Sequence, residues 1–177
     1  MFDARFADAW ARLPDYLGGH VLVSLVALAI GLGISLPVAV ASRHRPVMRG
    51  TLLTIASVVQ TIPGLALLAL FYPLLLALAA LSERMIGKSF SALGFLPSVL
   101  ALALYSMLPV LRNTVTGLNG VDPRLSEAAR VVGVPPWKLL RDIELPLALP
   151  VIMAGIRTSA VWVIGTATLA TPIGQTS

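Results

Sequence analysis

The feature that most constrains this chain is the length of its uncharged apolar runs. The 32 residues from Thr51 to Ser82 carry no charged side chain, and neither do the 21 residues from Val21 to Ala41. A helix needs about 20 mostly apolar residues to cross the roughly 30 Å hydrocarbon layer of a bilayer. The chain is 57% hydrophobic and only 12% charged, whereas an ordinary soluble domain is about 25% charged. The sequence therefore predicts an all-α, polytopic transmembrane bundle.

The positions of the apolar runs predict four spans, at about 21–41, 52–72, 95–111 and 147–169. As one straight helix, the run of 32 residues would be about 48 Å long. We therefore expect Pro63-Gly64 and Pro73 to kink or interrupt it. Apolar residues near helical spacing before the first span predict an extracytoplasmic or interfacial segment at 1–19. The transmembrane domain then covers 20–177.

The basic residues predict the orientation of the spans, because Lys and Arg are enriched in cytoplasmic loops. Eight basic residues follow the first and third spans: Arg43, Arg45, Arg49, Arg112, Arg124, Arg130, Lys138 and Arg141. The opposite side has four, which are Arg5, Arg12, Arg84 and Lys88. We therefore expect the N-terminus outside and the two basic loops in the cytoplasm.

Several function classes find no support in the residues. The chain has no Cys, which excludes a disulfide framework and thiolate chemistry, and its two His predict no metal site. The basic residues lie in short clusters between apolar runs, so we expect no nucleic-acid partner. An intramembrane enzyme would need a nucleophile with a base or paired carboxylates, and the spans contain no Asp or Glu. The chain has no Walker-type phosphate loop.

The longest polar stretch, Arg112–Pro146, carries the strongest local signals. Asp122 followed by Pro123 predicts a helix start, and Gly133 predicts its end. Pro135-Pro136 then begins a second short helix from Trp137 to about Glu144, and Pro146 marks the start of the last span. A helical hairpin of this kind could dock into a groove of a partner, with Ala128 and Ala129 permitting close approach. The alternative is that it only connects two spans.

The residue spacing in this stretch resembles a known family. Glu127-Ala128-Ala129, Gly133, Ile143 and Leu145-Pro146 match the EAA loop of ABC-importer permeases, EAA-x3-G-x9-I-x-LP. The stretches Thr61–Leu68, Leu108–Thr114 and Glu144–Thr158 are similar to the glycine betaine/carnitine/choline permease branch. The resemblance covers roughly Ser24 to Gln175.

The resemblance implies a type I ABC-importer (MetI-like) permease fold in the bacterial plasma (inner) membrane. It implies a multi-pass subunit that is not itself an enzyme and imports glycine betaine, choline or carnitine. The loop 120–146 would couple it to the ATPase through Glu127, Ala128, Ala129, Arg130, Gly133, Ile143, Leu145 and Pro146. The implied partners are a cytoplasmic ABC ATPase that binds ATP and Mg, an extracytoplasmic solute-binding protein, and a second permease copy or homologue. No cofactor is expected in this chain.

The sequence departs from the family in one respect. Such permeases have five or more core spans, whereas this sequence stops at Ser177 after the fourth, so we expect the last span to be missing. Ala170–Gln175 is similar to the loop that leads into the next span. The alternative functions are a permease for another small solute and a subunit of an ion-coupled transporter or channel.

Four polar or kink-forming residues at lipid depth are candidates for the translocation path: Gln60, Thr61, Pro63 and Arg157. Residues beside a proline kink can line a cavity, but a packed kink is the alternative for the first three. Arg157 is the one charge inside a predicted span, and such charges are costly and often functional. It is alternatively an anchor whose long side chain reaches the interface.

Overall fold

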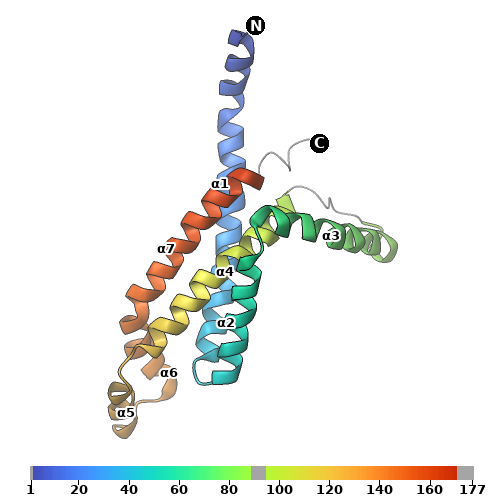
Figure 1. Ribbon diagram of the computed structural model, residues 1–177. Helices are drawn as coiled ribbons and strands as arrows, with labels where there is room; N and C mark the ends of the chain where they lie inside the picture. Colours follow the sequence, from blue (N-terminus) through green and yellow to red (C-terminus); the bar gives the residue numbers. More distant parts are fainter. Residues whose placement is uncertain (1, 89–94, 171–177) are drawn as a thin grey trace.

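The computed structural model describes residues 2–88 and 95–170, and within these ranges every regular element is a helix. Figure 1 shows their arrangement. The elements are α1 (Phe2–Ser42), α2 (Pro46–Thr61), α3 (Gly64–Ile86), α4 (Phe95–Asn119), α5 (Pro123–Val131), α6 (Pro136–Lys138), the π-helix η1 (Leu139–Glu144) and α7 (Leu145–Ala170). The all-α fold class expected from the sequence is confirmed.

The centre of the bundle is α4, which packs against α1 and α7 (Figure 1). Small residues allow the close approach of these helices. At Gly155 of α7, a Cβ atom would lie 2.6 Å from Asn113 Cβ and 2.7 Å from Pro109 O of α4. Because both neighbours belong to the facing helix, only glycine fits there without moving α7 away from α4.

Serine hydroxyls add hydrogen bonds between the three central helices. Ser159 Oγ of α7 donates to Ser106 O of α4 at 2.9 Å, and Ser35 Oγ of α1 donates to Met107 O at 3.2 Å. Ser35, Ser106 and Ser159 are all fully buried. In a membrane, where water does not compete, such bonds contribute to helix association together with close packing.

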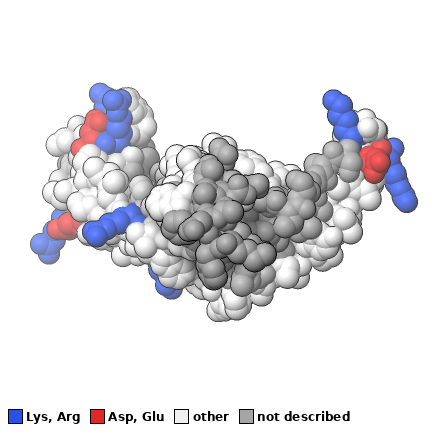
Figure 2. Space-filling view, turned by 90° about the horizontal axis from the view of Figure 1, so that it is seen from above, with Lys and Arg blue, Asp and Glu red and all other residues white. Residues whose placement is uncertain are grey.

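Four helical segments are long and apolar enough to cross a membrane in the described part of the chain. They are Tyr16–Ser42, Ala69–Ile86, Phe95–Asn119 and Pro136–Ala167. On the face seen from above, the charged side chains of the described residues lie mainly at two margins (Figure 2). One margin is the tip of α3, where Glu83, Arg84 and Lys88 are exposed.

The expected span 52–72 is not one helix. The helix α2 ends at Thr61, Ile62 is extended with φ −81° and ψ 121°, and α3 begins at Gly64 after Pro63. Pro63 lacks a backbone N–H and disfavours the helical conformation of the residue before it. Pro73, in contrast, lies within α3 and does not end it. The two helices diverge at this break, and α3 leads away from the bundle (Figure 1).

Residues 1–19 are not separated from the first span by a break in the helix. From Phe2 to Ser42, α1 is continuous, with Pro14 inside it. The Ala, Arg and Leu residues around Pro14 are good helix formers, so one missing N–H does not end the helix there. The expected loop Ala170–Gln175 lies, from residue 171 onward, outside the described residues.

Candidate functional site

The helix α5 begins as its sequence predicts. Asp122 is the N-cap, and its side chain accepts a hydrogen bond from the backbone N–H of Arg124 at 2.9 Å. Pro123 occupies the first helical position, where its missing N–H leaves no hydrogen bond unmade. Both features are local, so they could be read from four residues of sequence.

The end of α5 is a Schellman motif centred on Gly133. Gly133 has φ +82°, its N–H donates to Arg130 O at 3.0 Å, and the N–H of Val134 donates to Ala129 O at 2.9 Å. A Cβ at Gly133 would have no atom within 4 Å. The requirement for glycine is therefore the left-handed backbone conformation and not lack of space. We call α5, this turn and α6 (residues 123–138) the EAA hairpin.

The second arm of the hairpin differs from its expectation. A separate short helix from Trp137 to Glu144 is expected from the sequence, but α6 continues without a break through η1 into α7. Within η1 the N–H of Leu145 donates to Leu140 O, five residues earlier. In an α-helix the ring of Pro146 would crowd the carbonyl four residues before it. The wider π-turn gives that ring room, so Pro146 does not start a new helix.

The motif residues fall into an outward and an inward group. Glu127, Ala128 and Arg130 are exposed, and so are their apolar neighbours Val131 (87%) and Val132 (77%). Trp137 of the second arm is also exposed. Large apolar side chains exposed beside charged ones are typical of a protein interaction surface. Gly133 and Pro146 are exposed as well, and Ile143 and Leu145 are half-buried.

The structure corrects the expected position of Ala129 on the docking surface. Its side chain is only 6% exposed, so it faces the inside of this chain and does not offer close approach to a partner. The small side chain instead lets α5 lie against the return arm, since α5 packs on η1. Sequence spacing could not separate Ala128 from Ala129, because the choice depends on where the second arm runs.

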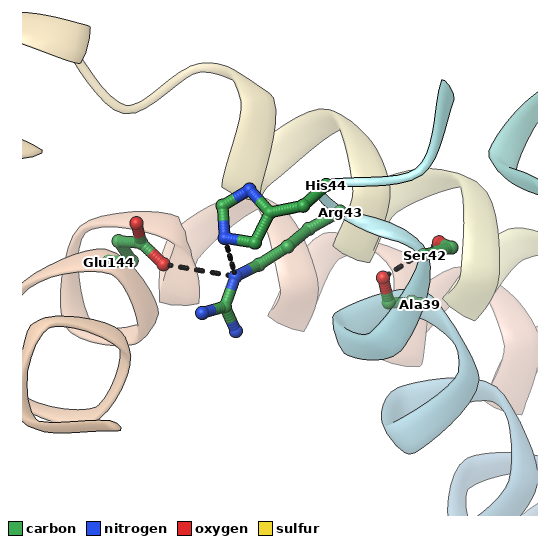
Figure 3. A network of polar contacts seen from close by, with 5 residues as sticks. All are labelled: Ala39, Ser42, Arg43, His44 and Glu144. Carbon is green, nitrogen blue, oxygen red and sulfur yellow. Dashed lines mark hydrogen bonds and ion pairs between the residues drawn. The ribbon is translucent and has the colours of Figure 1, made fainter. Parts of the chain in front are cut away.

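An ion pair that the sequence did not suggest joins the end of η1 to the connection between α1 and α2. Arg43 Nε lies 3.5 Å from Glu144 Oε2 and donates a hydrogen bond to His44 Nε2 at 2.8 Å (Figure 3). Glu144 is buried at the last position of η1. It occupies the variable position between Ile143 and Leu145. The one available signal was an acidic residue at the start of an apolar run.

The expected path residues at the kink are held by packing on one side. The hydroxyl of Tyr105 in α4 donates to the carbonyl of Ile62, which is freed by the break. Thr61 Oγ1 donates to Val58 O at 2.7 Å. Gln60 is half-buried, and Thr61 and Pro63 are exposed. The kink therefore has one packed face and one open face.

Arg157 lies on another element, on the exposed face of α7. Its side chain makes no ion pair or hydrogen bond to Gln60, Thr61 or any other residue in 2–88 and 95–170. A pocket of about 120 Å³ between α1 and α7 is lined by none of the four expected path residues. Its lining is His20, Val21, Ser24, Leu25, Leu28, Ala160, Val163 and Ile164.

Curated relatives are transport permeases. Over 157 residues the chain is 41% identical to the glycine betaine/carnitine/choline transport system permease protein OpuCB of Bacillus subtilis, covering 89% of this chain and 65% of OpuCB. It is 42% identical to the choline transport system permease protein OpuBB of the same organism, with 88% and 64% covered. For the osmoprotectant import permease protein OsmW of Salmonella typhimurium the identity is 41%, with 85% and 66% covered. The chain spans about two thirds of the length of these relatives.

Solved structures show the same fold. The inward-facing MetNI methionine ABC transporter matches with a TM-score of 0.74 at 20% identity, covering 94% of this chain and 76% of that one. An amino acid ABC transporter crystallised with histidines matches at 0.67 and 21% identity, covering 94% and 75%. The MetI-like fold that the EAA spacing implied is thereby confirmed.

A family model matches residues 29–177 of this chain. This range includes α2 to α7 and therefore the whole EAA hairpin. The chain belongs to the family of binding-protein-dependent transport system inner membrane components.

Proposed function

We propose that this chain is the membrane-spanning permease subunit of an ATP-driven ABC importer for quaternary-amine compatible solutes, namely glycine betaine, choline or carnitine. The observation that carries the proposal is the complete EAA spacing from Glu127 to Pro146, which begins on the EAA hairpin and continues through η1 into α7. The hairpin exposes Glu127, Ala128 and Arg130 beside apolar Val131 and Val132. The names of relatives that are about 40% identical support the class of solute.

The proposed partner of the hairpin is a cytoplasmic ABC ATPase. ATP and Mg would bind to that partner, and this chain would contribute no cofactor and no catalytic residue. An extracytoplasmic solute-binding protein would deliver the solute, and a second permease copy or homologue would complete the pore. In the ATPase interface, Glu127 and Arg130 would pair at the rim while Ala128, Val131 and Val132 lose contact with water, which is the usual anatomy of a protein interface.

The proposed orientation places the N-terminus outside and the hairpin in the cytoplasm. It is supported by the excess of Lys and Arg in the segments around the hairpin and the α1–α2 connection. A cysteine replacing exposed Arg124 should be protected from an impermeant thiol reagent in intact cells, and one replacing exposed Glu83 should react. The reverse pattern would contradict the orientation.

The proposed translocation path includes the open face of the kink at Gln60, Thr61 and Pro63. Exposure of Thr61 and Pro63 supports this, because residues at such a break are tolerated where they line a cavity or face another subunit. We assign Arg157 instead to an anchoring position at the membrane–water interface. It follows Ile152 by five residues, about 8 Å along α7, and Ile152 packs in the same cluster as Val40 near the end of α1.

The experiment that tests the function is uptake by the assembled transporter. The permease would be purified with the proposed ATPase and solute-binding protein and reconstituted into proteoliposomes. Labelled glycine betaine, choline and carnitine would each be offered with and without internal ATP. We expect uptake of at least one of them that requires both ATP and the binding protein. Uptake driven by an ion gradient without ATP would contradict the proposal.

A further inference from the structure

The contact between Arg43 and Glu144 is unusual for its burial. The two side chains are only 15% and 9% exposed, and Arg43 Nε lies 3.5 Å from Glu144 Oε2. Glu144 Oε2 accepts no hydrogen bond from any residue in the part of the chain that the structure describes. Burying a carboxylate oxygen without a hydrogen bond is costly, and the guanidinium of Arg43 lies where its charge offsets that cost.

The ion pair is not needed to hold α1 on the bundle. Next to it, Leu36 and Val40 of α1 already pack against the buried cluster of Leu118, Ala148 and Ile152. At such a site, two apolar side chains often stabilise the fold at least as well as a buried ion pair does. The specific effect of the charges is therefore to link the end of α1 to one particular residue of η1.

That residue lies where the helix can bend. Glu144 is the last residue of η1, and Pro146 follows two positions later. Helices bend at π-turns and prolines because the regular hydrogen-bond ladder is interrupted there. The EAA hairpin lies on one side of this turn and α7 on the other. A tilt of the hairpin relative to α7 would therefore displace the Glu144 carboxylate relative to Arg43.

The geometry of the pair is that of a contact that can break and re-form. Figure 3 shows Arg43 facing Glu144 through Nε, with its two terminal nitrogens directed away from the carboxylate. The pair is thus not the two-bond fork that makes arginine–carboxylate contacts strong. Nε also donates to His44 Nε2 at 2.8 Å, so His44 can hold the guanidinium in place when Glu144 moves.

We propose that Arg43 and Glu144 are positioning residues that transmit the tilt of the EAA hairpin to α1. The pair would thereby couple ATP hydrolysis in the partner to opening and closing of the transport path. This inference rests on the proposed function, because it assumes that an ATPase binds the hairpin. It predicts that loss of either charge separates ATP hydrolysis from uptake without preventing assembly.

The test is the number of solute molecules taken up per ATP hydrolysed, measured in proteoliposomes that contain the assembled transporter. We expect Arg43→Gln and Glu144→Gln each to retain the ATPase and to lower this ratio about tenfold, within the usual range of allosteric coupling. The exchanged pair R43E/E144R should recover most of the ratio. Arg45→Gln, at an exposed residue of the same connection, is the matched control and should equal wild type.

A second pair of variants keeps the test decisive if Glu144→Gln assembles poorly. Arg43→Lys retains the charge and should keep the ratio, whereas Arg43→Met should lower it. Three results would overturn this inference while leaving the proposed function intact. The first is an unchanged uptake-to-ATP ratio in the single variants, and the second is a ratio in R43E/E144R as low as in the single variants. The third is an equal decrease of the ratio in Arg43→Lys and Arg43→Met. A wild-type transporter without ATP-dependent uptake would instead overturn the proposed function.

Discussion

Gly133 determines the angle between the two arms of the EAA hairpin through its backbone conformation alone. Its φ of +82° is disfavoured for residues with a Cβ, by about 1 kcal/mol. No atom would obstruct a side chain there. We expect Gly133→Val to change the turn and abolish co-purification of the ATPase, and Gly133→Asn, which tolerates this conformation better, to retain it. Equal retention by both variants would show that the turn does not set the docking angle.

Ala128 and Ala129 are neighbours with opposite environments, which makes them a matched pair. Ala128→Trp should block ATPase binding while the permease keeps its thermal stability, because Ala128 is exposed. Ala129→Trp should destabilise the permease itself, since overpacking a buried site costs about 1–3 kcal/mol. Apparent melting temperature in detergent and ATPase co-purification distinguish the two. A stable Ala129→Trp protein would contradict the inward position of that residue.

At the scale of single residues, the sequence predicted what local chemistry determines. Asp122 marks the start of α5 and Gly133 its end, because a capping side chain and a left-handed turn act within four residues. The inward position of Ala129 and the Arg43–Glu144 pair depend on residues that are distant in sequence. Arg43 and Glu144 are brought together only when α1 and α7 pack in one bundle, which no local pattern reports.

At the scale of elements, the break between α2 and α3 is held by a hydrogen bond from α4. Tyr105→Phe would leave the carbonyl of Ile62 without this partner. A buried acceptor that loses its donor costs about 1–3 kcal/mol. This bond is only partly buried, so we expect a modest decrease in apparent melting temperature in detergent. Tyr72→Phe, at an exposed tyrosine of α3, should leave it unchanged. Equal melting temperatures for the two variants would mean that the Tyr105 bond does not hold the kink.

The helix α7 carries a charge on its exposed face, and the proposed interfacial position of Arg157 has a direct consequence. Arg157→Lys should keep both membrane yield and uptake, because a lysine stem can also extend its charge to water. Arg157→Leu should mainly lower the yield of inserted protein. Normal yield with uptake abolished in both variants would instead place Arg157 in the translocation path.

The lengths of the elements were predictable in part. Apolar runs located the helices that contain 21–41, 95–111 and 147–169, because lipid exposure requires continuous apolar sequence. The region 52–72 was assigned to one span although Pro63 divides it. Composition alone could not show which of the two prolines interrupts the helix. Pro63 lies at the end of a helix, while Pro73 is accommodated within one. The continuous path from α6 into α7 was missed because the π-turn beside Pro146 has no simple sequence signature.

At the scale of the whole molecule, the helical bundle and the EAA hairpin have different structural properties. The helices α1, α4 and α7 pack closely through small and hydroxyl-bearing residues, which suits a rigid body in lipid. The EAA hairpin lies at one end of this body and exposes both charged and large apolar side chains. A movement imposed on the hairpin can therefore be transmitted to the bundle through α7 and the Arg43–Glu144 contact.

The most direct test of this account is site-specific photo-crosslinking from the hairpin in intact cells. A benzophenone amino acid would replace Val131, which is 87% exposed on α5, or, as a control, Ile164, an exposed residue near the opposite end of α7. The account predicts that irradiation links the Val131 variant to an ABC ATPase and that the Ile164 variant gives no such product. Absence of the ATPase product at Val131, or an equal product at Ile164, would contradict the assignment of the hairpin as the ATPase-coupling site.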